Sequence, residues 1–318
     1  MSPSPHQARP ATALGRRRFL GAVGLGLAAR LVAGCGDGPT TGTAAPEIVG
    51  LFSTDRVVVA GRPQRLPFAL VEPDGPDRGD LAELAVTVRS GDEIVDRLTV
   101  TGRVVEHDHV GTPEPGHSHS DFLRYYPLRA EFPRPGVFDL EVDLGDGAVG
   151  RLPVQAFATD DVTVLGPGQP MPAIVSATTG RPAGVDTLCT RAPTPCPFHE
   201  LGIDEAVTAG RPLAVLVTSP ALCATAYCGA VLETLIVAAP ARPGLAVVHL
   251  EVYVNADEIA GNLADPRLER APAVVELGLD FEPALFVVDG EATVVDRLDA
   301  IYDRRELDAV LDAVVGRR

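Results

Sequence analysis

Hydrophobic and polar residues alternate along much of residues 47–158, with the period of two that places every second side chain on one face of a β-strand. Two alternating runs, 84–88 and 94–101, are separated by a turn cluster and predict a β-hairpin. The runs 138–144 and 149–158, separated by an Asp-Gly turn, predict a second hairpin. We therefore expect the N-terminal region to be all-β.

Two shorter apolar runs, 57–60 and 66–71, add further strands to this region. Short strands separated by frequent turns are typical of an immunoglobulin-like β-sandwich, and we predict that fold for residues 47–158. The following residues, 159–198, are rich in Gly, Pro and Thr and show no periodicity. That composition predicts a linker and places the domain boundary within it.

The pattern changes from residue 199 onward to alternating helical and strand-like segments. Continuous apolar runs are typical of strands buried on both faces, because neither face then needs polar side chains. An amphipathic stripe near the C-terminus predicts a closing helix. Residues 199–318 are therefore expected to form an α/β domain with these elements in order: helix 199–209, strand 212–218, helix 227–238, strand 245–254, a short helix at 257–263, strands 284–288 and 292–298, and helix 304–315.

The N-terminus carries the pattern of an export signal, which does not belong to the fold. Arg16 and Arg17 precede an apolar run, 20–29, and resemble the twin-arginine export motif, although Gly15 stands where that motif usually has Ser or Thr. The apolar run is shorter than the roughly 20 residues that are needed to span a bilayer. Residues 1–35 are therefore predicted to be a signal peptide.

A Leu-Val-Ala-Gly-Cys sequence ends this segment at Cys35 and resembles a bacterial lipobox, in which the cysteine is lipidated and becomes the new N-terminus. The alternative is an ordinary signal peptide that happens to end near a cysteine. Residues 36–46 are rich in Gly, Thr, Ala and Pro and predict a flexible tether. The lipobox resemblance implies a cell-envelope protein that is lipid-anchored on the outer face of the cytoplasmic membrane.

The charge balance narrows the range of partners. The 318-residue chain contains no Lys and has a net charge of −16, so a nucleic-acid partner, which needs a basic face, is not expected. Hydrophobic residues make up 46% of the sequence, which is enough for the cores of two domains. The sequence has no phosphate-binding glycine loop and no zinc-protease motif, and we predict no cofactor.

Export would place the cysteines in an oxidising compartment, where thiols pair into disulfides. With Cys35 set aside, the other cysteines fall into two pairs that are local in sequence. Cys189 and Cys196 enclose a short Pro-rich segment, and we predict a structural disulfide between them. The alternative is a relay pair that exchanges with the second pair, Cys223 and Cys228.

The second pair follows a predicted buried strand and opens the next helix. A helix N-terminus presents unpaired N–H groups that stabilise a thiolate, which is the nucleophile of disulfide exchange. Downstream, Pro283 precedes the predicted C-terminal hairpin. These two segments and the order of elements over 199–318 resemble the thioredoxin superfamily, in which redox cysteines lie at this point and a cis-proline faces them. The resemblance implies that Cys223 and Cys228 form the redox site and that Pro283 shapes its substrate-facing groove.

The cysteine spacing departs from the family pattern, because four residues separate Cys223 from Cys228 where thioredoxin has two. In a regular helix, residues five apart have Cα atoms about 8.6 Å apart. A disulfide requires Cα atoms closer than about 7 Å. We therefore expect Cys223 in the loop and Cys228 in or just before the first helical turn.

These features make a membrane-anchored thiol–disulfide oxidoreductase, acting on protein thiols outside the cytoplasm, the leading hypothesis. The chain as a whole resembles bacterial lipoproteins that join a β-domain to a thioredoxin-like domain. The β-domain would then serve as a spacer or a partner-binding module. The alternative is a non-catalytic scaffold with a thioredoxin-like fold and structural disulfides, because fold alone does not establish function.

Metal handling is a further hypothesis. Copper chaperones of the same superfamily hold copper with two cysteines and a distant His, and the candidates for that His here are His249 and His199. The cysteine spacing of this chain differs from theirs as well. A loop rich in Pro and Gly also contains two His-X-His pairs, which are candidate ligands for zinc, copper or nickel: His107, His109, His117 and His119.

Overall fold

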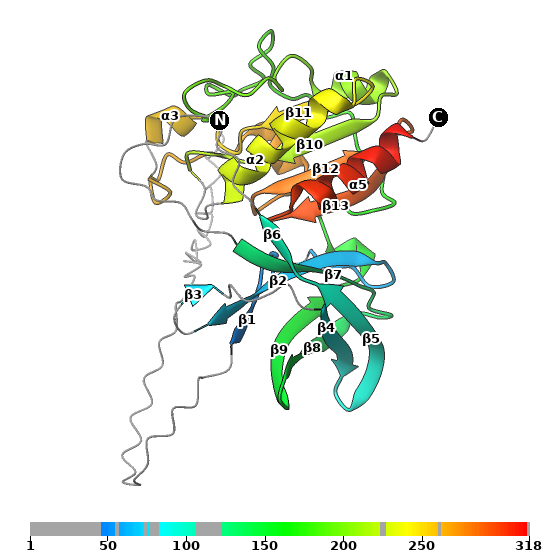
Figure 1. The fold of residues 1–318 in the computed structure, drawn as a ribbon. Coiled ribbons are helices and arrows are strands. Elements are labelled where there is room, and N and C mark those ends of the chain that lie inside the picture. The colour runs from blue at the N-terminus through cyan, green and yellow to red at the C-terminus, as the bar shows by residue number, and fades with distance from the viewer. Residues whose placement is uncertain are drawn as a thin grey trace, which may run out of the picture. The chain divides into compact units, whose positions relative to one another are not determined.

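The computed structural model describes residues 46–54, 57–72, 75–76, 83–105, 123–222, 227–259 and 262–316 (Figure 1). Several sequence predictions lie outside the described residues: the signal peptide with Cys35, almost all of the tether, the loop with the four His residues, and Cys223.

The N-terminal part of the described chain consists of two antiparallel sheets. The first sheet has the strand order β1-β2-β7-β6 with β3 beside β2, and the second has the order β5-β4-β8-β9. Their bounds are β1 (Glu47–Gly50), β2 (Gln64–Glu72), β3 (Gly75–Pro76), β4 (Glu83–Ser90), β5 (Glu93–Thr101), β6 (Arg103–Val105), β7 (Leu123–Ala130), β8 (Gly136–Gly145) and β9 (Ala148–Ala156). Both predicted hairpins are confirmed as β4–β5 and β8–β9, and the immunoglobulin-like assignment stays a prediction.

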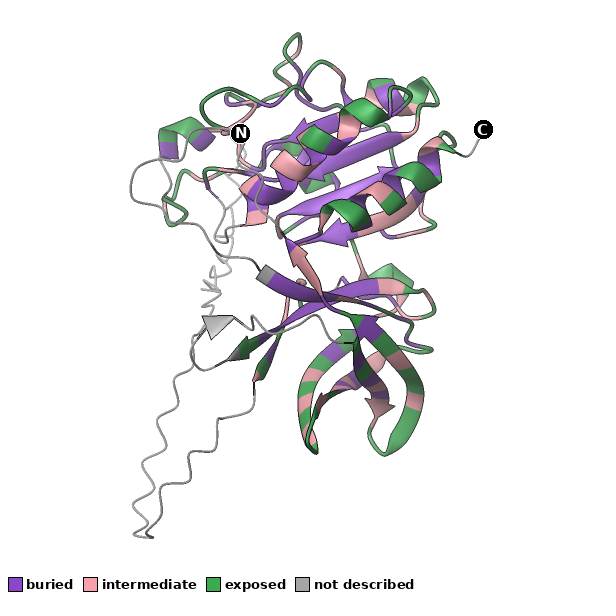
Figure 2. Ribbon diagram, viewed as in Figure 1, coloured by how far each residue is buried: buried purple, intermediate pink, exposed green. Residues whose placement is uncertain are grey.

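Alternating burial explains why these segments are strands. On β4 the apolar side chains of Val86 and Val88 are buried, and they lie opposite the buried Val142 and Leu140 of β8 (Figure 2). The acidic positions of β8 alternate with them and face outward. One face of the sheet therefore packs into the core while the other stays in water.

The predicted strand 57–60 is wrong. In this segment Val59 makes only an isolated bridge to Phe157. Its backbone pairing is limited to Phe157, which donates to the carbonyl of Val58 and accepts from the N–H of Ala60, while the side-chain amide of Gln64 accepts from the N–H of Val59 at 2.7 Å and donates to its carbonyl at 2.5 Å. The valines of the segment are still buried, so the apolar run indicates burial and not a full strand.

The C-terminal part contains the sheet β11-β10-β12-β13. Strand β10 (Leu213–Val217) is parallel to β11 (Ala246–Leu250) and antiparallel to β12 (Ala284–Val288), which forms a hairpin with β13 (Val294–Asp299). The helices of this part are α1 (Ile203–Thr208), α2 (Tyr227–Ala238), α3 (Ala256–Ile259), α4 (Pro272–Glu276) and α5 (Arg304–Val315), and the 3-10 turns are η1 (Thr159–Asp161) and η2 (Ala239–Ala241). This element order is the one predicted from the sequence for residues 199–318, with α4 added between β11 and β12.

Both faces of this sheet are covered, and all residues of β10 and β12 are buried (Figure 2). Helices α2 and α5 lie side by side on one face (Figure 1), where they share a hydrophobic cluster with alternate residues such as Leu216 and Leu285. The intervening residues, such as Val215 and Phe286, pack on the other face with apolar side chains of α1 and α4. This double coverage accounts for the continuous apolar runs in the sequence.

The bounds of several C-terminal elements differ from the predictions: strand 245–254 is limited to Ala246–Leu250, strand 292–298 is Val294–Asp299, and the short helix 257–263 is Ala256–Ile259 in the described residues. The predicted helix 199–209 begins only at Ile203, because the residues before it run beside β11, where the N–H of His249 donates to the carbonyl of Phe198 at 3.1 Å. Helix α4 was not predicted. It is short and starts at Pro272, a residue suited to the first position of a helix.

The predicted linker 159–198 contains no long element but packs as part of the fold. It covers both edges of the C-terminal sheet: the N–H groups of Gly168 and Met171 donate to carbonyls of Val294 and Ala292, and Phe198 accepts from β11. Its apolar side chains, among them Ile174, are buried. Covered edges cannot pair with other chains. The domain boundaries themselves stay a prediction.

A buried ion pair connects the two parts. Arg65 of β2 donates from Nε to Glu306 of α5 at 2.7 Å, and its other nitrogens donate to the carbonyls of Asp299 and Ile301. The Tyr125 hydroxyl of β7 donates to the same carboxylate at 2.8 Å. Burial opposes the charged form of Glu306, but Arg65 and Tyr125 outweigh it, so the pKa of Glu306 is lowered.

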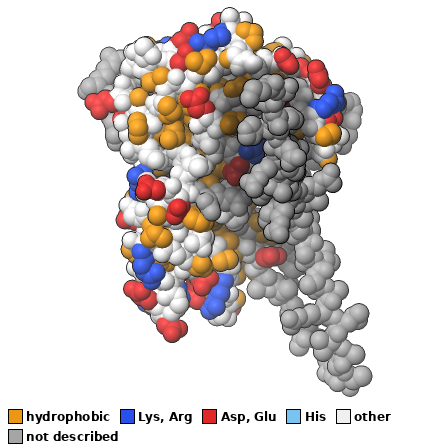
Figure 3. Space-filling view, turned by 180° about the vertical axis from the view of Figure 1, so that it is seen from behind, with side chains coloured by type: hydrophobic (Ala, Val, Ile, Leu, Met, Phe, Trp, Pro, Cys, Tyr) orange, Lys and Arg blue, Asp and Glu red, His pale blue; other side chains and the backbone are white. Residues whose placement is uncertain are grey.

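The described surface is mixed in charge on the face drawn in Figure 3, where Arg side chains are scattered singly among acidic ones. Among the helices of the described ranges, none combines the length and the apolar character needed to cross a bilayer.

Substituting Glu306→Ala is expected to destabilise the fold by about 3–5 kcal/mol, because it leaves the Arg65 charge buried without its partner. The measurement is the free energy of unfolding by urea. The matched control is Glu258→Ala, which removes a carboxylate from a 3.8 Å pair with Arg267 whose side chains are 63% and 59% exposed. We expect it to cost less than about 1 kcal/mol. Equal losses in the two variants would contradict a special role for the buried pair.

Candidate functional site

The strand register of the C-terminal sheet places the ends of three chain segments side by side at one end of the sheet. Val217, the last residue of β10, lies opposite Leu250 at the end of β11 and Ala284 at the start of β12. The residues just beyond these positions, including Ser219, Glu251 and Glu282, therefore gather at one end of the sheet. The N-terminus of α2 follows from the same end of β10.

Cys228 lies in the first turn of α2, which confirms the position expected for it. Its side chain is fully buried, and its sulfur is engaged in a disulfide. The sulfur lies 3.7 Å from Oε2 of Glu282. Cys223 lies outside the described residues.

Glu282 is a carboxyl group that the sequence analysis missed. It immediately precedes Pro283, and the Glu282–Pro283 peptide bond is cis, as the resemblance implied. The N–H of Ser219 donates to its Oε2 at 2.5 Å. Burial raises the pKa of Glu282 to about 7, and the neighbouring charge of Glu251 adds to the effect. A group with that pKa exchanges a proton near neutral pH, directly beside the sulfur of Cys228.

Glu251 is a second buried carboxyl group, one residue beyond β11. It is 3% exposed, and its Oε2 accepts hydrogen bonds from the N–H and the hydroxyl of Thr190 at 2.8 and 3.0 Å. Its Oε1 has no hydrogen-bond partner among the described residues. Burial raises the pKa of Glu251 as well. Thr190 also accepts from the N–H of Ala221, so it connects Glu251 to the loop that leads to the cysteines.

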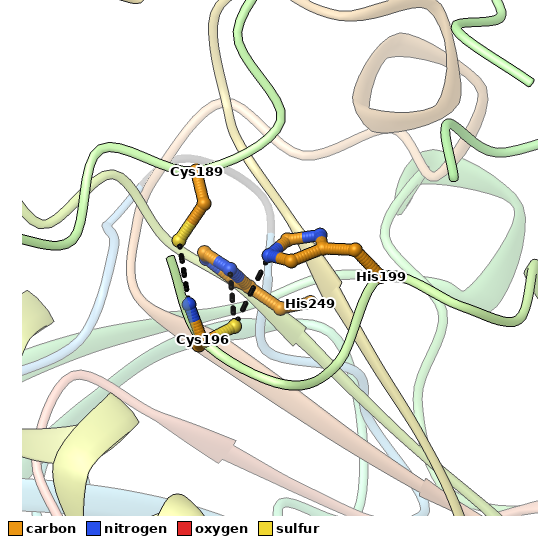
Figure 4. A group of neighbouring side chains, drawn as sticks. All are labelled: Cys189, Cys196, His199 and His249. Atoms are coloured by element: carbon orange, nitrogen blue, oxygen red, sulfur yellow. Dashed lines mark hydrogen bonds between the residues drawn. The ribbon is translucent and has the colours of Figure 1, made fainter. Parts of the chain in front are cut away.

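A second cluster lies beside this end of the sheet and contains Cys189, Cys196, His199 and His249 (Figure 4). One sulfur or nitrogen atom from each residue lies within 4.8 Å of all the others. Sγ of Cys196 is 3.1 Å from Nε2 of His199 and 3.3 Å from Nδ1 of His249. His249 projects from β11, and the other three residues come from the segment without helix or strand that precedes α1.

The structure differs here from the predicted disulfide, because Cys189 and Cys196 are both free. Two imidazoles occupy the space beside their sulfurs, and Sγ of Cys189 accepts from the backbone N–H of Cys196 at 3.5 Å. The structure also assigns His199 and His249 to these cysteines, and not to Cys228. The copper-chaperone arrangement considered for His249 is therefore not the one formed by the described residues.

Electrostatics couple the four groups of this cluster. Hydrogen bonding from Cys196 lowers the pKa of Cys189, helped by both imidazoles, and the same interaction together with burial raises the pKa of Cys196. Burial opposes protonation of His249, but the hydrogen bond and the charge of Cys189 outweigh it, so the pKa of His249 is raised. One thiolate is thus held between donors.

A sequence signal for this cluster existed. Cys189, Cys196 and His199 follow one another at intervals of seven and three residues, which brings metal-ligating side chains together within one loop. Sequence spacing could not assign the fourth member, His249, to this cluster, because His249 lies on a strand 50 residues after His199.

Comparisons with known proteins give distant likenesses. No protein-family model matches the chain, and no curated protein matches its sequence. Among solved structures, a thioredoxin-family thiol:disulfide interchange protein from Chlorobium tepidum TLS is similar with 13% identity and a TM-score of 0.31, over 46% of this chain and 98% of that chain. Trypsin-activated alpha-2-macroglobulin from Escherichia coli is similar with 13% identity and a TM-score of 0.24, over 44% of this chain and 8% of that chain. Likenesses this distant establish no activity.

The raised pKa of Glu282 predicts a pH-dependent stability. A carboxyl group whose pKa is higher in the folded state favours folding below its unfolded pKa, and this contribution is lost as the pH rises through about 7. Glu282→Gln removes the titration, so the variant should gain stability relative to the parent chain between about pH 5 and pH 8, by up to about 3 kcal/mol.

The measurement is urea unfolding of both chains across that pH range. Glu276→Gln, at an exposed position of α4, is the matched control and should change stability by less than about 0.5 kcal/mol. A pH-independent difference for Glu282→Gln would show that the carboxyl group ionises normally in the folded protein.

Proposed function

We propose that this protein is a thioredoxin-like thiol–disulfide oxidoreductase of the cell envelope, anchored to the outer face of the cytoplasmic membrane through a lipid on Cys35. Cys223 and Cys228 form its redox pair, Pro283 shapes the groove that receives the substrate, and protein thiols and disulfides are the substrates. The β-region serves as a spacer or as a partner-binding module.

One observation carries the proposal: the disulfide-bonded Cys228 lies in the first turn of α2 and contacts a half-buried carboxyl group whose pKa lies near neutrality. The helix N-terminus favours a thiolate at this position. The carboxyl group supplies what exchange at a buried sulfur needs, which is a local site for the proton. A purely structural disulfide has no use for a titrating group at its sulfur.

The exchange reaction balances as follows. A partner thiolate attacks one sulfur of the Cys223–Cys228 disulfide, so that a mixed disulfide forms and the other sulfur leaves as a thiolate. A second partner thiol then attacks the mixed disulfide, which leaves the partner oxidised and both cysteines reduced. Two electrons and two protons reach the cysteine pair. Glu282 donates a proton to the sulfur of Cys228 in this direction and accepts it in the reverse direction.

The complete burial of Cys228 is also what a static disulfide in a non-catalytic scaffold would show. Reduction potential separates the two functions, because structural disulfides resist reduction whereas catalytic ones do not.

A redox titration of the full chain tests the proposal. The protein is equilibrated in graded thiol–disulfide buffers, free thiols are trapped, and the Cys223–Cys228 peptide is counted by mass separately from the Cys189–Cys196 peptide. We expect reversible titration at a potential between about −120 and −270 mV, the range of working oxidoreductases. A pair that stays oxidised below about −300 mV, or that never forms a disulfide, would refute the redox function in favour of the scaffold.

Glu282 also predicts the pH dependence of the rate. The reduced chain should be oxidised by glutathione disulfide with a rate that rises as the carboxylate forms through about pH 7. Glu282→Gln should lose this rise and react about a hundredfold more slowly at pH 8, whereas Glu276→Gln should match the parent chain. Identical pH profiles for Glu282→Gln and the parent chain would exclude Glu282 as the proton acceptor.

A further inference from the structure

We propose that Cys189, Cys196, His199 and His249 bind one zinc ion, which clasps the loop before α1 to strand β11. The site does not include the proposed redox pair, so the two proposals are tested independently. Two thiolates and two imidazoles are a donor set of structural zinc sites.

The spacing of the donor atoms fits a tetrahedral ion. With Zn–S bonds of about 2.3 Å and Zn–N bonds of about 2.0 Å, a sulfur and a nitrogen on one tetrahedral zinc ion lie about 3.5 Å apart. The distances from Sγ of Cys196 to the two imidazole nitrogens are 3.1 and 3.3 Å, and all four donor atoms lie within 4.8 Å of one another. The two sulfur–nitrogen distances need to lengthen by a few tenths of an ångström, and the widest separation between donor atoms needs to close by about 1 Å, to reach tetrahedral geometry.

The orientation of His249 is set for metal binding. Its Nε2 lies 2.9 Å from the carbonyl oxygen of Thr218, which is able only to accept, so Nε2 carries the proton. Nδ1 therefore presents its lone pair to the centre of the cluster. A carbonyl that fixes the tautomer of a ligating imidazole is a common outer contact of metal sites.

Burial leaves the cluster short of other partners. His249 is 1% exposed, and Cys196 and His199 are each 4% exposed. Buried polar groups in native proteins are satisfied, and an ion at the centre would engage one atom of every side chain in the cluster. Four protein ligands leave no open position, which favours a structural role over a catalytic one.

The loop explains why such a clasp is useful. The segment from Cys189 to His199 has no helix or strand and is held by separate contacts: the ion pair between Arg191 and Glu233 of α2 at 2.6 Å, the hydrogen bonds of Thr190 to Glu251, and the hydrogen bond from the N–H of His249 to the carbonyl of Phe198. Zinc would tie its two ends to β11. Both cysteines bind as thiolates, so any thiol proton that they still carry, that of Cys196 included, is released to solvent, and the two thiolates neutralise the charge of Zn²⁺.

Metal analysis of the purified full chain tests the proposal. The chain is reduced, supplied with zinc alone, dialysed and analysed by elemental mass spectrometry, and we expect about one zinc ion per chain. Cobalt supplied in its place should give the intense visible absorption of a tetrahedral thiolate site. Copper retained in preference to zinc, or no metal retained, would overturn the assignment. So would a Cys189–Cys196 disulfide in the protein as isolated from the envelope.

Two variants locate the ion. Cys196→Ser should lose at least nine tenths of the zinc, whereas a chain with His107, His109, His117 and His119 replaced by Ala should keep it. Zinc that follows the four loop His residues and survives Cys196→Ser would overturn the proposal. Because Cys196→Ser risks misfolding, thiol trapping in the parent chain provides an independent check: zinc should slow alkylation of Cys189 and Cys196 at least tenfold, and a chelator should restore it. Unchanged alkylation would count against the site.

Discussion

The central strand β10 is the element on which both candidate sites depend. It pairs with β11 on one side and with β12 on the other, so the chain segments that leave these three strands emerge at one level. Glu251, Glu282 and the start of α2 meet there because of that register. A shift of one residue in β11 would turn His249 to the opposite face of the sheet and remove it from the cysteines. Continuous burial of β10 on both faces is what fixes the register.

Ionisable side chains in the interior occur in two arrangements, one with a partner of opposite charge and one without. Arg65 and Glu306 are buried together and satisfy each other, with the Tyr125 hydroxyl and two carbonyls completing the network. Glu251 is buried and Glu282 is half-buried, neither has a cationic partner of that kind, and burial raises the pKa of each. The first arrangement joins β2 and β7 to α5, and the second stores a proton where sulfur chemistry is proposed. Removing one partner from the first is costly, whereas neutralising the second relieves a penalty.

Periodicity predicted most of the C-terminal elements, because strands buried on both faces and an amphipathic closing helix have strong signatures. Strand β12 and helices α2 and α5 have the predicted bounds. What failed depends on partners distant in sequence. The run 57–60 is buried but bonded to the side chain of Gln64, and the segment taken for a linker covers two sheet edges. For the sites, the position of Cys228 followed from local sequence, and the cis bond before Pro283 followed from the family resemblance. Glu282 and the grouping of His249 with Cys189 and Cys196 required the sheet register.

The separation of the two cysteine pairs has a consequence for how the chain would mature. Four thiols free to pair at random allow three sets of two disulfides, and only one of them joins Cys223 to Cys228. In the folded structure Cys189 and Cys196 lie against imidazoles and are not bridged. Thiols held in this way, by hydrogen bonds or by a metal, are not available to form disulfides. The disulfide between Cys223 and Cys228 would then be the single oxidation product. The cluster of Cys189, Cys196, His199 and His249 would then prevent incorrect disulfide pairing if the chain matures in the oxidising compartment proposed for it.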